Sequence, residues 1–159
     1  MKDAQVGQPT RSSTRVTRRR PANRQGRFGA RPDSLPDLLI AEAVLDIPAE
    51  DLTRVARMEL AESALHAPAA TLGGVEFSPD PANKTAVLAA RLINNHPLPE
   101  GNKRVGDLYA LEFVAPNGGT WTHPPDNPEG DKTVAMIEGV AAGIIDEAAL
   151  TAWIAERLA

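Results

Sequence analysis

Residues 82–114 read ANKTAVLAARLINN, then HPLPEGNKR, then VGDLYALEFV. The first segment, 82–95, is apolar on most sides of a helix, and a helix of this kind is usually central and buried. The third segment has apolar residues at helical spacing that we expect to face a core, namely Val105, Leu108, Tyr109 and Leu111. The middle segment, 96–104, is a loop between the two helices, and no other part of the chain is as dense in chemically active side chains.

The flanking sequence is also helical in pattern. Pro48, followed by two acidic residues, opens a helix well, because the first turn has unpaired amide donors. Pro68 marks the end of that helix. We expect helices over residues 37–45, 48–65, 82–95, 103–114, 131–142 and 146–158. A short strand over 74–77 is the main exception, so the chain is predicted to form an all-α bundle.

Charge divides the chain into two parts. Residues 1–32 contain nine Lys or Arg and one acid, Asp3, whereas the remaining residues contain eight basic and twenty acidic side chains. The first part also has few large apolar residues, so it is predicted to be a disordered basic extension. Residues 33–159 are predicted to be one folded domain. The extension is either a solvated tail or an arm that binds nucleic acid or another acidic partner, and it has no interleaved aromatic residues that would favour an arm that binds nucleic acid.

Composition excludes several kinds of site. The 159 residues include no cysteine, which rules out disulfides, zinc-thiolate sites and thiol nucleophiles. No apolar run approaches the roughly 20 residues that span a bilayer. The basic N-terminal segment lacks the apolar core of a secretory signal. These observations predict a soluble intracellular protein without a membrane partner.

The end of the loop has the features of an anion site. Asn102 is expected to cap the following helix, whose first turn leaves amide donors with partial positive charge. Gly101 lets the backbone approach a phosphate closely. Lys103 and Arg104 oppose the helix dipole at this position, which makes sense if an anion lies between them and the amides.

The start of the loop supplies the remaining chemistry. Glu100 places a hard carboxylate beside the expected phosphate, which is the usual way of holding Mg²⁺. His96 can accept a proton from an attacking hydroxyl at neutral pH. Leu98, between two prolines, can anchor the loop in the core, and rigid placement is what catalysis by positioning requires.

The string from His96 to Arg104 resembles the signature of the Fic/death-on-curing superfamily. The AMP-transferring branch typically reads H-P-F-x-(D/E)-G-N-G-R-x-x-R. The death-on-curing branch has Lys in place of the second Gly and lacks the final Arg. This chain has Lys103 at the first of these positions and Asp107 at the second, so it is more similar to the death-on-curing branch. The resemblance extends over residues 37–159.

The resemblance implies a compact helical fold and the role of a toxin in a bacterial toxin–antitoxin system, acting in the cytoplasm. Death-on-curing toxins transfer phosphate from a nucleoside triphosphate to a hydroxyl of elongation factor Tu, which stops translation. By this likeness, His96 is the general base and Glu100 the metal-binding acid. Gly101 and Asn102 form the anion-holding turn, and Lys103 and Arg104 bind the phosphates. The implied cofactors and partners are Mg²⁺, ATP or another nucleoside triphosphate, a cognate antitoxin, and a protein substrate of the translation machinery.

The sequence departs from the family pattern at two positions. Leu98 stands where the family usually has Phe, and Asp107 could pair with a neighbouring cation or point away. No inhibitory Ser/Thr-x-x-x-Glu-Gly/Asn helix is recognisable in the sequence, which favours inhibition by a separate antitoxin.

Two other functions are compatible with the sequence. The first alternative function is transfer of AMP to a protein hydroxyl. The second is an inactive Fic-like binding protein that engages nucleic acid through residues 1–32.

Overall fold

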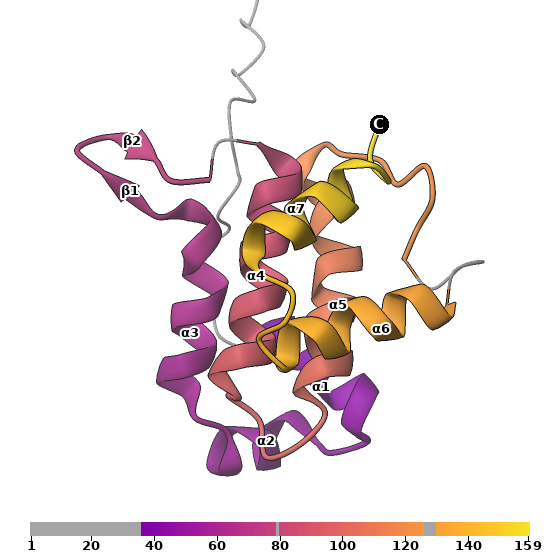
Figure 1. The fold of residues 1–159 in the computed structure, drawn as a ribbon. Helices are drawn as coiled ribbons and strands as arrows, with labels where there is room; N and C mark the ends of the chain where they lie inside the picture. Colours follow the sequence, from indigo (N-terminus) through magenta and orange to yellow (C-terminus); the bar gives the residue numbers. More distant parts are fainter. Residues whose placement is uncertain (1–35, 79, 126–129) are drawn as a thin grey trace, which may run out of the picture.

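The computed structural model describes residues 36–159 except 79 and 126–129, so the predicted basic extension, 1–32, lies outside the described residues. Seven α-helices account for most of the described chain: α1 (Pro36–Leu45), α2 (Ala49–Val55), α3 (Met58–His66), α4 (Pro81–Asn95), α5 (Asn102–Val114), α6 (Gly130–Ala141) and α7 (Glu147–Ala155). The predicted all-α fold is confirmed (Figure 1). None of the helices in the described part of the chain is long and apolar enough to cross a bilayer.

The remaining elements are short. Two turns of 3₁₀ helix follow α3 and α5, at Ala67–Ala69 and Ala115–Asn117. The strands β1 (Thr71–Leu72) and β2 (Val75–Glu76) form a small antiparallel hairpin before α4. The expected strand at 74–77 is therefore present as β2, although it is only two residues long.

Helix α4 is the centre of the fold. Its N-terminus is capped by Asp80, whose carboxylate accepts a hydrogen bond from the Asn83 N–H at 2.8 Å. The helix contacts α3, α5, α6 and α7, and most of its residues are buried. The prediction of a central helix over 82–95 is confirmed.

Two apolar cores lie against α4. One joins it to α6 and α7 through Ile137, Val140, Leu150 and Ile154. The other joins it to α1, α2, α3 and α5, and it includes the loop residue Leu98. Because the loop after α4 contributes to a core, its backbone is fixed by packing as well as by its two helices.

Small residues bring α4 and α5 close together. A Cβ atom added to Gly106 of α5 would lie 2.8 Å from Ile93 Cγ1 and 3.2 Å from the Ala89 carbonyl oxygen, both on α4. Tyr109 and Val105 of α5 are buried as expected, whereas Leu108 is 37% exposed and does not face a core. Its expected orientation was wrong because α5 is covered over a narrower arc than its apolar pattern implies.

The prediction of one helix over 48–65 is wrong. The helix breaks after Val55, where Ala56 adopts an extended conformation (ψ 146°), and α3 starts at Met58. The intervening Arg57 donates its backbone N–H to the carbonyl of Pro97 at 2.7 Å. A tertiary hydrogen bond to the loop thus takes a donor that a continuous helix would have used.

Candidate functional site

The loop of residues 96–101 turns the chain from the end of α4 to the start of α5, beside α2 (Figure 1). His96 occupies the C-cap of α4 in a left-handed conformation, with φ 48° and ψ 56°. A non-glycine residue rarely adopts a positive φ, and such residues are concentrated at functional sites. The side chain is exposed, so the imidazole is accessible to a substrate.

The middle of the loop is anchored in the core. Leu98 is 7% exposed and Pro97 is also buried, whereas Pro99 and Glu100 are exposed. The expected anchoring by Leu98 is therefore observed. The first half of the loop is therefore buried and its second half is exposed. The exposed half presents Glu100 to solvent beside the turn at Gly101.

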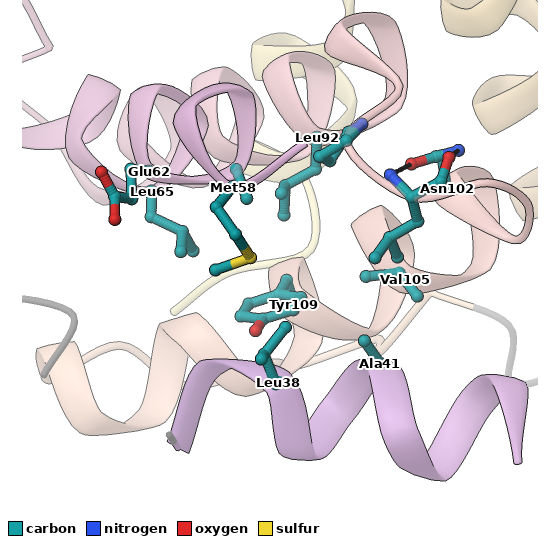
Figure 2. A pocket seen from close by; sticks show the side chains of 12 residues that line it. Leu38, Ala41, Met58, Glu62, Leu65, Leu92, Asn102, Val105 and Tyr109 are labelled. Atoms are coloured by element: carbon teal, nitrogen blue, oxygen red, sulfur yellow. Dashed lines mark hydrogen bonds between the residues drawn. The ribbon is translucent and has the colours of Figure 1, made fainter. Parts of the chain in front are cut away.

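Asn102 does not cap α5 as expected. Gly101 is the N-cap residue, and Asn102 is the first residue of the helix. The Asn102 Oδ1 accepts from the Leu98 N–H, and Nδ2 donates to the Leu98 carbonyl, both at 2.9 Å (Figure 2). Both groups of the amide are directed to the buried Leu98 backbone, so the side chain does not cap the helix.

Two features of the structure favour glycine at position 101. Its φ is 71°, in the left-handed region that favours glycine. A Cβ atom at this position would also overlap Leu45 Cδ2, at the end of α1. The turn that precedes α5 is therefore defined both by its own backbone and by its packing on α1.

The first turn of α5 leaves backbone amides without partners inside the helix. The first intrahelical bond runs from the Val105 N–H to the Gly101 carbonyl at 2.9 Å. The amides of residues 102–104 precede that bond, so they lie outside the α-helical ladder. Such amides and the helix dipole favour a bound phosphate.

The two cations at this helix start point to different neighbours. Lys103 Nζ lies 3.3 Å from Glu138 Oε1 of α6, and both side chains are about half exposed. Arg104 is exposed and lines a shallow surface hollow with Ala43 and Val44 of α1; Asp107 lines the same hollow. The structure places the cations on either side of the α5 N-terminus rather than together.

Glu100 is exposed at the tip of the loop, next to the Gly101 turn. In the described part of the chain, no group of three or more His, Cys, Asp or Glu side chains could hold a metal ion. One carboxylate beside a phosphate site suits Mg²⁺, which keeps several waters and shares its ligands with substrate phosphates. The residues therefore fit an ion that arrives with a nucleotide.

Sequence reasoning did not identify Arg57 as part of this site. Its guanidinium donates through Nη2 to the carbonyl of Asn95, at 3.2 Å, and to that of His96. Arg57 lies 39 residues before His96, in a segment that has the pattern of a continuous helix. No local pattern marks it.

An apolar pocket of about 70 Å³ lies on the core side of the loop, between α1 and α3 (Figure 2). Met58 and Tyr109 extend into it, and Leu38 and Ala41 of α1 close one side. Asn102 is the one proposed site residue among its lining residues; His96, Glu100, Lys103 and Arg104 do not line it. The pocket is thus separate from the exposed face that carries the proposed chemistry.

Comparison with known proteins identifies one family. A model described as Fic/DOC family matches residues 30–114, which include the loop and both of its helices. A search of curated proteins and a search of solved structures each gave no match.

Proposed function

The chain belongs to the Fic/DOC family, and we propose that it is a death-on-curing type toxin that transfers phosphate from a nucleoside triphosphate to a protein hydroxyl. The observation that carries the proposal is the position of an exposed His96 at the end of α4, one short loop away from the open amides of α5. A proton acceptor and a phosphate site lie at the two ends of one fixed loop.

The reaction assigns a separate task to each part of the loop. His96 accepts the proton of the target Ser or Thr hydroxyl, whose oxygen forms a bond to the γ-phosphorus. The bond between that phosphorus and the β–γ bridging oxygen breaks, and the nucleoside diphosphate leaves. The amides of residues 102–104 hold the phosphates, with Lys103 and Arg104 on either side.

Glu100 would hold Mg²⁺ through its exposed carboxylate. When bound, the ion neutralises charge on the phosphate oxygens. Because the protein offers a single carboxylate at this point, we expect ion and nucleotide to bind together.

Two residues favour phosphate transfer over AMP transfer. Lys103 stands where the AMP-transferring branch has glycine, and Asp107 stands where it has its final arginine. AMP transfer requires the nucleotide to bind with its α-phosphate at the acceptor. A missing arginine at the far end of the motif weakens that orientation, since one phosphate contact is lost.

The proposed target is elongation factor Tu, and the proposed regulator is a separate antitoxin. Both are suggested by the family resemblance, and we propose that the protein acts in the bacterial cytoplasm. Modification of an elongation factor stops translation, so we expect the chain to arrest growth when it is produced without its antitoxin.

The test compares the wild type with His96→Ala in bacterial cells that lack any antitoxin. We expect the wild type to arrest growth, and elongation factor Tu from those cells to gain the mass of one phosphoryl group. The variant should do neither. A gain equal to AMP would favour the other branch, and harmless growth with both proteins would refute the toxin role.

A further inference from the structure

Arg57 contacts three consecutive carbonyl groups, which belong to the last residue of α4 and the first two residues of the loop. Its Nη2 donates to the carbonyls of Asn95 (3.2 Å) and His96, and its backbone N–H donates to that of Pro97 (2.7 Å). These carbonyls belong to the proposed general base, His96, and to the residues directly before and after it. The contacts depend on the break between α2 and α3, because a residue inside a continuous helix would use its N–H within that helix.

The guanidinium lies at the C-terminus of α4, where a positive charge is favourable. The last carbonyls of a helix have no partner within the helix, and they carry partial negative charge. Asn95 is the last residue of α4 and His96 is its C-cap. Arg57 satisfies both of their carbonyls with one charged donor.

The backbone of His96 also needs support from outside the loop. Its left-handed conformation costs free energy for a residue with a Cβ atom, so contacts from neighbouring groups stabilise it. The peptide groups on both sides of His96 determine the direction of its Cα–Cβ bond. Arg57 bonds to both of these peptide groups, through the carbonyls of Asn95 and His96.

We infer that Arg57 is a positioning residue, which acts on the proposed reaction by holding His96 in the conformation that presents its imidazole. The inference rests on the proposed function for its kinetic consequence. Since the guanidinium is bonded to backbone carbonyls, its task differs from that of a phosphate ligand such as Lys103 or Arg104.

The kinetic test uses Arg57→Ala in transfer of the γ-phosphate of ATP to elongation factor Tu. We expect kcat to fall by about 10- to 100-fold, because small displacements of a catalytic group have effects of this size. The KM for ATP should change by less than about twofold, since the α5 N-terminus is untouched. Ethylguanidinium added to the variant should restore part of kcat.

Arg54→Ala is the matched control. Arg54 lies three residues before Arg57, its side chain is 74% exposed, and it pairs with Asp51 of its own helix at 3.0 Å. We expect this variant to keep both kcat and KM. A raised KM with normal kcat in Arg57→Ala would instead assign the guanidinium to the nucleotide and overturn the inference.

A structural readout separates this inference from the proposed function. Backbone NMR shifts of His96 report whether it keeps its positive φ, and exchange of the His96 and Leu98 amides reports the mobility of this part of the loop. We expect Arg57→Ala, but not Arg54→Ala, to lose the left-handed shifts and to exchange faster. Unchanged shifts and exchange would overturn the inference even if the wild type is an active kinase.

The same measurements decide the question if no transfer is detected. A wild type without transferase activity would refute the proposed function, while the NMR comparison would still show whether Arg57 holds His96. Should Arg57→Ala fail to fold, Arg57→Gln, which retains one amide donor, takes its place in both assays. Arg57→Gln should show smaller changes in kcat, in the NMR shifts of His96 and in amide exchange, in the same directions.

Discussion

The side chain of Asn102 forms two hydrogen bonds with the backbone of Leu98, one in each direction. Both are 2.9 Å long, and Asn102 is only 7% exposed, so they form away from water. The first residue of α5 thereby fixes the loop that follows α4. The distance between His96 and the α5 amides is set by this contact as well as by the two helices.

Replacing Asn102 with Ala should destabilise the protein. The buried N–H and carbonyl of Leu98 would both lose their partner, and each unsatisfied group costs about 1–3 kcal/mol. We expect the free energy of unfolding in urea to fall by about 2 kcal/mol or more. The control is Asn94→Ala on the exposed face of α4, with an effect within about 0.5 kcal/mol. Equal effects would contradict the assigned role of Asn102.

Gly101→Ala should impair nucleotide binding. The new side chain would force the turn away from its φ of 71° and against Leu45, which displaces the α5 amides. Gly118→Ala is the control, because Gly118 also has a positive φ of 84° but has nothing within 4 Å of an added Cβ. Gly118→Ala should lose about 1–2 kcal/mol of stability through its backbone alone, and Gly101→Ala should lose at least as much, because its Cβ also meets Leu45. Calorimetric titration with ATP and Mg²⁺ should show weaker binding for Gly101→Ala alone, and matching affinities would argue against a phosphate site at this turn.

Glu138→Gln should strengthen nucleotide binding. Glu138 holds Lys103 at 3.3 Å, so it competes with a phosphate for that cation and repels the phosphate itself. We expect the Kd for ATP to fall a few-fold, roughly 1 kcal/mol, with little change in stability because the ion pair is exposed. The control, Glu112→Gln, removes the same charge from an exposed position further along α5. Weaker binding by Glu138→Gln would show that the pair orients Lys103 instead.

Leu98→Phe should be tolerated. Leu98 lines the apolar pocket of about 70 Å³ between α1 and α3, so a larger ring has space to extend into. We expect a stability change below about 1.5 kcal/mol, whereas Leu98→Ala should cost about 2–5 kcal/mol. Leu88→Phe, in the same core but away from the pocket, should cost about 1–3 kcal/mol through overpacking. Thermal unfolding of the three variants checks the order.

The central helices could be predicted because their signal is local. The apolar pattern of 82–95 and the turn residues around it are properties of the segment itself, and the structure places α4 over Pro81–Asn95. The loop between α4 and α5 follows from the same two patterns. Its anchoring by Leu98 could also be predicted, because the two prolines restrict the backbone and burial of the leucine side chain between them is favourable.

The remaining details depend on contacts between distant segments. Asn102 has a high local preference for a helix cap, but the buried backbone of Leu98 takes its side chain and leaves the cap to Gly101. At the break between α2 and α3, the backbone N–H of Arg57 bonds to Pro97, and its side chain bonds to Asn95 and His96, all far away in the sequence. Neither outcome is visible in the periodicity of either segment.

The most direct test of the central claim is label transfer from ATP to protein in a bacterial lysate supplied with the purified chain and Mg²⁺. We expect γ-labelled ATP, and not α-labelled ATP, to label a protein band with the wild type, and His96→Ala to label none. Label transferred equally well by His96→Ala, or no label from either nucleotide with the wild type, would contradict phosphate transfer by this loop.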